Sequence, residues 1–271
     1  MTICIAAACE NKYIVVATDR MLTVNPPNIE VEGDYVKTVE ITKNCVAATS
    51  GSALAFTPLL REVKAEIMRQ STTDIEQIVN LIRSAYFRVR NRKLEEEILF
   101  PMGLTLKDYY ANQQGLAPSV VSLAVQNMMK YNYNLWILVA GVDEKGPHLT
   151  RLENPGKTFN YDTIGYLAIG SGEIHAVSTF IASGYGLKAT LQRGLAVAFE
   201  AKKRSEKAPG VGELTDMYVV TKEGATHLPE EAIVELNGMY EKRLQSEEKV
   251  VSEVEAMVAK MGLEKYVGKE A

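Results

Sequence analysis

The grouping of its short apolar runs constrains the fold of this chain more than any other feature. Runs rich in β-branched residues come in sets, with turn residues inside each set and helix-like stretches between the sets. A parallel sheet would need a helix between most of its strands. The order strands, helix pair, strands, helix pair, strands therefore predicts an α+β fold of two stacked antiparallel sheets with helices outside both.

The expected strands are bounded by turn residues. They lie at residues 3–9, 13–18, 36–41, 45–50, 135–143, 147–153, 166–170, 216–221 and 225–228. The longer stretch between the second and third of them contains Asn25, Pro26 and Pro27, and we expect a loop there.

The expected helices follow from apolar residues at helical spacing. One helix is predicted after Gly51, and a second is predicted to begin at Thr73, where Glu76 completes a capping-box pattern. Two more are predicted at about 173–184 and 188–204.

Composition limits the classes of function. The 271 residues are 46% hydrophobic and 24% charged, which is typical of a globular chain with a substantial core. The formal net charge of −4 gives no general attraction to nucleic acid or anionic membranes, and the basic stretches 88–93 and 202–204 are expected to be solvated. The run Ile3–Cys9 is too short for a secretory signal, and no run approaches the roughly 20 apolar residues that span a bilayer. We expect a cytoplasmic protein that binds neither nucleic acid nor a membrane.

The sequence offers no metal or cofactor motif. The cysteines, Cys4, Cys9 and Cys45, lie in apolar strand patterns without metal-ligand spacing, so buried thiols are expected. The histidines are His148, His175 and His227, and their scattered positions fit core or solvated side chains. No phosphate-binding or dinucleotide-binding glycine motif is present. We expect neither metal nor cofactor.

Five stretches carry a resemblance to a known family. They read MTICIAAACENKYIVVATDRMLT, VKTVEI, AATSGSALAFTPLLREVKAEI, WILVAGVDEKGPHLTRLENPG and AIGSG, in that order. They resemble proteasome β-type subunits, which are N-terminal-nucleophile (Ntn) hydrolases, over roughly residues 2–85 and 135–228. The resemblance implies a four-layer αββα sandwich in a single Ntn-hydrolase domain over residues 1–271. Compared with an ordinary β subunit, two segments run longer, and we expect a helical insertion at about 87–134 and a C-terminal helical extension at about 229–265.

The resemblance implies a catalytic group centred on Thr2. Its hydroxyl would be the nucleophile and its own α-amine, with a pKa of about 8, would be the base once Met1 is removed. Lys37 would lower the pKa of both groups, and Asp19 would orient the lysine. Gly51 matches the oxyanion-hole glycine and Ser171 the serine that binds the N-terminal amine. Taken alone, these residues also fit a strand threonine, an inward salt bridge, a helix start and a simple turn.

The resemblance also implies substrate contacts, with one departure from the family pattern. Thr23 would bind the substrate backbone, and the specificity pocket would contain Tyr35, Thr49 and Ala53. The usual supporting Asp-x-x-Ser motif before the last main strand is absent from RSEKAPGVGELTD. The candidates to replace it are Ser205, Glu206 and Asp216.

Apolar positions in the insertion and in the C-terminal extension predict contacts with other chains. In the insertion, the apolar positions Leu116, Val120, Leu123 and Met128 predict a helix. In the C-terminal extension, Val250, Val254, Met257 and Met261 fall on one face of a predicted helix. Apolar stripes of this kind usually meet a partner, so a homo-oligomeric ring is expected.

The function predicted best is a threonine peptidase that hydrolyses peptides or unfolded proteins inside a ring. The alternatives are an Ntn amidohydrolase acting on a small amide and a non-catalytic structural subunit of a proteasome-like assembly. The presence of Thr2, Asp19 and Lys37 together disfavours the structural subunit. The sequence identifies neither the natural substrate nor an ATPase activator.

Overall fold

The computed structural model describes residues 2–24 and 29–262, with Val24 and Ala53 described by backbone alone. The chain forms two compact units that divide between Leu228 and Pro229. The first unit is an α+β structure whose sheets are antiparallel throughout. This confirms the prediction of an α+β structure with antiparallel sheets and helices, and every strand pairing within the described residues is antiparallel.

The first large sheet has the order β10-β1-β2-β11-β12. Its strands are β1 (Ile3–Cys9), β2 (Tyr13–Asp19), β10 (Tyr166–Gly170), β11 (Thr215–Val220) and β12 (Ala225–His227). Every residue of β1 is buried, because this strand lies inside the sheet and both faces of the sheet are covered.

The second large sheet has the order β5-β6-β7-β8-β9 and packs face to face on the first. Its strands are β5 (Thr38–Thr42), β6 (Cys45–Gly51), β7 (Leu135–Asp143), β8 (Gly146–Glu153) and β9 (Lys157–Asn160). One apolar core joins the inner faces of both sheets. It includes Cys4, Ala6 and Ala8 from β1, Val46 and Ala48 from β6, and Leu138 and Ala140 from β7.

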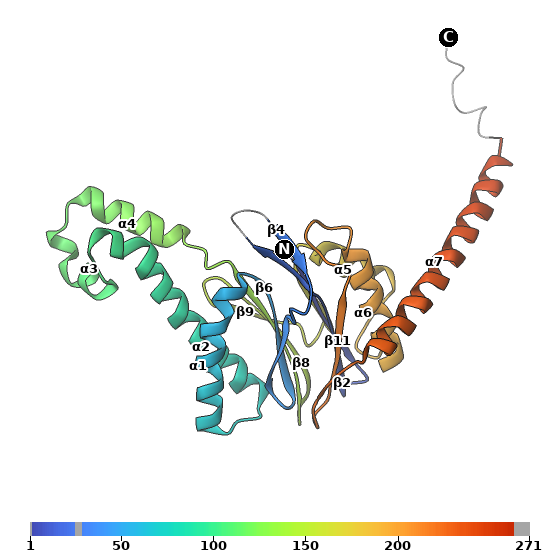
Figure 1. Cartoon of the computed structure of the whole chain (residues 1–271), viewed down its shortest axis with the longest axis horizontal. Coiled ribbons are helices and arrows are strands. Elements are labelled where there is room, and N and C mark those ends of the chain that lie inside the picture. The colour runs from blue at the N-terminus through green and yellow to red at the C-terminus, as the bar shows by residue number, and fades with distance from the viewer. Residues whose placement is uncertain (1, 25–28, 263–271) are drawn as a thin grey trace, which may run out of the picture. The chain divides into compact units, whose positions relative to one another are not determined.

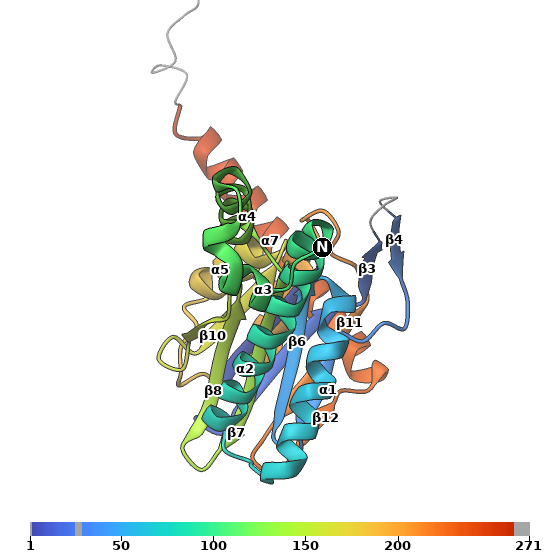
Figure 2. The same ribbon diagram turned by 90° about the vertical axis from the view of Figure 1, so that its left-hand side faces the viewer.

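Helices cover the two outer faces (Figure 1). On the second sheet lie α1 (Ala53–Gln70) and α2 (Ile75–Leu94), as Figure 2 shows, and their apolar stripes form a second core with β6 and β7. On the first sheet lie α5 (Glu173–Ala182) and α6 (Leu191–Ser205), which contact β10, β1 and β2.

The insertion folds as a small helical lobe with a core of its own. It contains η1 (Glu95–Leu99), η2 (Phe100–Met102), α3 (Leu106–Asn112), η3 (Gln113–Gly115) and α4 (Pro118–Lys130). Of the apolar positions expected to contact another chain, Leu116 and Met128 pack on this core within the same chain. Leu123 is instead 54% exposed, and Ala124, between Val121 and Val125, points inward. The predicted apolar stripe is therefore displaced by one residue in this part of α4 (Pro118–Lys130). The helix face that contacts the core of the lobe passes through Val121, Ala124 and Val125.

Three further predictions need correction. The stretch between β2 and β5 is not a plain loop, since β3 (Met21–Val24) and β4 (Ile29–Glu32) form a hairpin, while Asn25, Pro26 and Pro27 lie outside the described residues. Helix α2 is capped by Asp74 and not by Thr73, because the Asp74 carboxylate accepts the Gln77 amide at 2.9 Å.

The two basic stretches are not wholly solvated either. Arg90 is 9% exposed and Lys202 is completely buried. Both side chains lie on the inner faces of their helices, within the first unit. The prediction of solvated basic residues was wrong at these two positions, because a run of charges does not show which helix face is buried.

The second unit contains one long helix, α7 (Glu230–Ala259). The predicted stripe Val250, Val254, Met257 and Met261 is exposed, with exposed fractions between 51% and 67%. None of the helices in the described residues is both long and apolar enough to cross a membrane.

Candidate active site

The predicted catalytic side chains lie where strands begin and end. Thr2 directly precedes β1, Asp19 is the last residue of β2, and Lys37 directly precedes β5. The antiparallel register, with Cys4 opposite Thr18, brings the start of β1 beside the end of β2. All three side chains are buried, with exposed fractions of 2%, 0% and 4%.

Thr2, Asp19 and Lys37 form a closed triangle of polar contacts. The Thr2 hydroxyl donates to Asp19 Oδ1 at 2.7 Å, and Lys37 Nζ donates to the same oxygen at 2.6 Å. Lys37 Nζ also donates to Thr2 Oγ1. A buried ammonium against a hydroxyl oxygen favours the deprotonated hydroxyl, because the surroundings screen the attraction weakly. This arrangement can activate the Thr2 oxygen as a nucleophile.

Asp19 is held by donors on both carboxylate oxygens. Its Oδ1 accepts from Thr2 Oγ1, Lys37 Nζ and the Ile3 amide, and its Oδ2 accepts from the Met21 and Gly212 amides. The three amide contacts measure between 2.9 and 3.1 Å. These donors satisfy both oxygens of the buried carboxylate and fix its orientation.

Ser171 lies at the backbone of Thr2, as its predicted role requires. The Thr2 nitrogen donates to Ser171 Oγ at 3.2 Å. The Ser171 hydroxyl lies 3.3 Å from the Thr2 carbonyl oxygen and 3.1 Å from that of Pro209, and its single proton serves one of them at a time.

A small pocket opens beside Thr2. It is lined by Thr2, Met21, Leu22, Thr23, Tyr35, Lys37, Thr49, Ser50 and Gly51. It therefore contains three of the four predicted substrate-binding residues, Thr23, Tyr35 and Thr49. Ala53 begins α1, but its side chain lies outside the described part of the chain. Among the described lining residues, none carries a carboxylate.

Gly51 closes β6 in a conformation that requires glycine. Its φ is +98°, and a Cβ there would lie 2.1 Å from the Asn134 carbonyl oxygen. The chain therefore turns from strand to helix beside Thr2 without a side chain in the way.

None of the three candidates for the missing support motif has a hydrogen bond to the Thr2 nitrogen among the described contacts. The Ser205 hydroxyl lies within hydrogen-bond distance of the Ala201 and Gly172 carbonyls and donates to one of them at a time. Glu206 pairs with Lys202 and Lys203, and Asp216 pairs with Arg20 and His227. The loop after α6 reaches the site through its backbone instead, with the Gly212 amide on Asp19 and the Pro209 carbonyl by Ser171. Sequence reasoning missed both residues, although the Gly-Val-Gly run in this loop was a signal for a close backbone approach.

The cysteines are unsuited to nucleophilic chemistry. All three are free and buried, as predicted. Burial raises the pKa of Cys4 and of Cys45 to about 12, and it also raises the pKa of Cys9. At neutral pH the thiolate, which is the nucleophilic form, is scarce at each. Among the described residues, no cluster of three metal-ligating side chains occurs.

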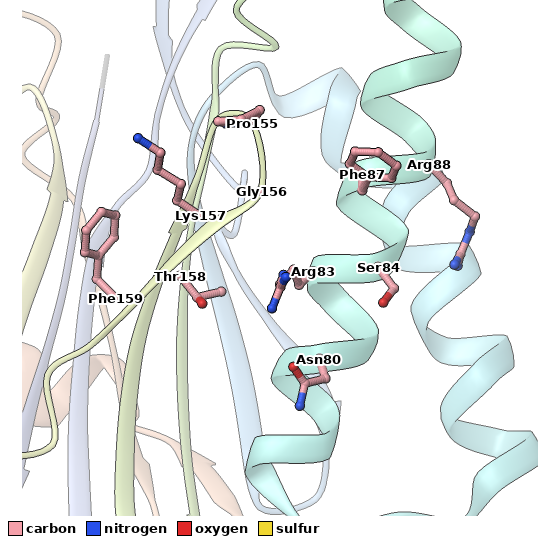
Figure 3. Close-up of a pocket in the computed structure, with 10 residues that line it drawn as sticks. All are labelled: Asn80, Arg83, Ser84, Phe87, Arg88, Pro155, Gly156, Lys157, Thr158 and Phe159. Atoms are coloured by element: carbon pink, nitrogen blue, oxygen red, sulfur yellow. The ribbon is translucent and has the colours of Figure 1, made fainter.

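A larger groove lies elsewhere, between α2 and the edge strand β9. Figure 3 shows its lining, which includes Arg83, Phe87 and Arg88 of α2 and Thr158 of β9. It contains none of the predicted site residues. Titratable, hydrogen-bonded side chains gather at Thr2 and not in this groove, so size alone is a poor guide to a functional site.

No protein-family model matches this chain, and no curated protein matches it. The functional assignment consequently rests on its residues and their geometry.

Proposed function

We propose that this protein is an N-terminal-nucleophile hydrolase of the proteasome β type, with Thr2 as the nucleophile. One observation carries the proposal: the Thr2 hydroxyl lies in a buried triangle, 2.7 Å from Asp19 Oδ1 and in contact with Lys37 Nζ. A structural threonine at the start of a strand needs neither a buried ammonium nor a carboxylate against its hydroxyl, because burying two charges is costly.

The proposed reaction starts with removal of Met1, which leaves Thr2 with a free α-amine. Thr2 Oγ1 attacks the amide carbonyl carbon while the α-amine accepts the hydroxyl proton. The Gly51 amide stabilises the resulting oxyanion, and the amine returns the proton to the leaving nitrogen as the C–N bond breaks. Water then hydrolyses the acyl ester on Thr2 by the same path. Lys37 stabilises the negative charge that develops on Oγ1, and Asp19 holds Lys37.

The arrangement of the sheets and helices also supports the proposal. Helices cover both outer faces of two packed antiparallel sheets, which is compatible with the four-layer αββα sandwich of the Ntn hydrolases. We infer peptides or unfolded proteins as substrates and a homo-oligomeric ring as the working assembly. Enclosure in a ring would keep a broad peptidase away from folded proteins.

A second candidate function is the hydrolysis of a small amide. The small size of the pocket beside Thr2 favours it, since a single chain offers little room there for an extended peptide. Parallel assays with peptides and with small aliphatic amides separate the two functions.

The test is the intact mass of the purified protein before and after treatment with a threonine-directed covalent inhibitor. The expected result is a chain that lacks Met1 and gains one adduct. Thr2→Ala should gain none, whereas Thr2→Ser, which keeps a hydroxyl, should still be labelled. An active protein that retains Met1, or an adduct on Thr2→Ala, would contradict the proposal.

A further inference from the structure

Lys202 is a charged residue buried deep beside the site. It lies on α6, its side chain is completely buried, and its Nζ donates to Glu206 Oε1 at 2.6 Å and to the Glu213 carbonyl at 2.5 Å. Burial lowers the pKa of Lys202, while the contact with Glu206 opposes this effect. A buried ammonium is maintained only where its partners compensate for lost hydration. Here the partners are both ends of one loop, residues 206–214.

That loop contacts three parts of the site. The Gly212 amide donates to Asp19 Oδ2 at 3.0 Å, and the Pro209 carbonyl lies 3.1 Å from Ser171 Oγ. The Leu214 amide donates to Glu32 Oε1 at 2.8 Å, on the hairpin β3–β4. The position of the loop therefore influences the catalytic carboxylate, the serine at the Thr2 nitrogen and the hairpin that carries part of the pocket.

Gly212 allows this approach because it has no side chain. A Cβ at Gly212 would lie 2.0 Å from Glu32 Oε1 and 3.0 Å from the Cβ of Met21. A larger residue would displace the Glu32 carboxylate, which accepts the Leu214 amide, and would press against the Met21 Cβ.

We propose that Lys202 is a positioning residue that fastens loop 206–214, so that the Gly212 amide and the Pro209 carbonyl orient Asp19 and Ser171. The loop thereby supplies through its backbone the support that an Asp-x-x-Ser motif supplies through side chains. The expected effect on turnover rests on the proposed function. The anchoring of loop 206–214 by Lys202 does not depend on it.

The first measurement is peptide-resolved amide hydrogen exchange of the full chain, which requires no activity. Lys202→Met keeps the volume of the side chain and removes the charge, and Glu206 retains its contact with Lys203 at 2.8 Å. Exchange across residues 207–214 should accelerate roughly tenfold or more, since the loop opens locally. Lys203→Met is the matched control, because Lys203 shares the Glu206 partner and has no described bond to Glu213. It should leave the exchange of the loop unchanged.

The second measurement is turnover. Lys202→Met should lower kcat roughly ten- to a hundredfold, because a small misplacement of catalytic groups costs that much. KM should change far less, and Lys203→Met should keep the wild-type kcat. Gly212→Ala moves the same amide without touching Lys202 and should lower kcat similarly. The double variant should lose little more than either single one, because both act through one loop.

The outcomes separate the two proposals. Unchanged loop exchange in Lys202→Met, or wild-type kcat in both Lys202→Met and Gly212→Ala, overturns the positioning role. Strictly multiplicative losses in the double variant overturn it as well. If Lys202→Met does not fold, Gly212→Ala decides the kinetic question alone. If the wild type shows no Thr2-dependent hydrolysis, the proposed function fails, while the exchange measurement still decides whether Lys202 fastens the loop.

Discussion

At the scale of single residues, Lys37 has two tasks that a substitution can separate. It neutralises buried Asp19 and it contacts the Thr2 hydroxyl oxygen. In Lys37→Met, Asp19 keeps four of its donors, so the chain should fold with a loss of about 3 kcal/mol in unfolding free energy. Labelling of Thr2 should slow by about a hundredfold or more, because the charge that stabilises the alkoxide is gone.

This prediction is checked by inhibitor-labelling rates together with urea unfolding. Lys12→Met, at an exposed lysine, serves as the control and should match the wild type in both. Labelling of Lys37→Met at the wild-type rate would show that the ammonium is structural.

The pocket lining predicts specificity for uncharged side chains. Thr23, Tyr35 and Thr49 offer no carboxylate to compensate the desolvation of a lysine or arginine, and Lys37 repels both. Cleavage of a peptide library should therefore favour uncharged residues before the cut bond. Thr49→Asp should shift the preference toward basic residues by about tenfold, and the uncharged Thr49→Asn should not. A wild-type preference for basic residues would refute the pocket assignment.

At the scale of elements, one histidine fastens the β7–β8 hairpin in a pH-dependent way. His148 on β8 lies 2.9 Å from Asp162 and 3.0 Å from Asp143 on β7, and the Asp162 contact is the main cause that raises the pKa of His148 above 6.5. A raised folded-state pKa means that this stabilisation is complete below about pH 6.5 and is lost as the pH rises through the folded-state pKa. Burial raises the pKa values of Asp143 and Asp162, but their hydrogen bonds outweigh burial and lower both pKa values. The stabilisation that these two carboxylates contribute is therefore lost only in acid.

Urea unfolding across pH 5.5–9 tests this directly. The wild type should lose about 1 kcal/mol over the alkaline part of that range relative to His148→Gln, whose profile should be flatter. His227→Gln, at the other histidine with a carboxylate partner, is the comparison. An equal slope in wild type and His148→Gln would remove His148 as the cause.

The elements also show what local sequence could predict. Strands β1, β2, β6 and β7 follow directly from apolar runs, and the sheet class follows from their grouping. The hairpin β3–β4 was missed because its strands are only four residues long, which is too short for a clear apolar period, and β4 is largely exposed. Lys202 was misjudged because its burial depends on Glu206 and on a carbonyl eleven residues later, which no local charge pattern encodes. Within the site, Thr2, Asp19 and Lys37 were inferred through the resemblance, whereas the backbone role of Gly212 required the fold.

At the scale of the whole molecule, α7 should be where chains meet. Val251, Val254 and Val258 in its last turns and Met261 just after its end are exposed at alternating spacings of three and four, which is the pattern of a helix that packs on another helix. We predict that the purified protein is an oligomer, because an apolar seam of this length is rarely left in water. Light scattering at micromolar concentration should give a mass several times the 29.9 kDa of one chain.

The seam can be tested with two variants of equal charge. Val254→Glu places a carboxylate in the seam and should shift the oligomer toward smaller species, because burying an unpaired charge at a helix contact is costly. Ala256→Glu lies on the opposite face of the same helix and should leave the mass unchanged. Circular dichroism of both should show equal helix content, so that a loss of assembly is not a loss of α7. A wild-type mass of 29.9 kDa refutes the assembly itself. An oligomer unaffected by Val254→Glu places the contact elsewhere, and the helical lobe around Leu99 and Ala124 is then the next surface to alter.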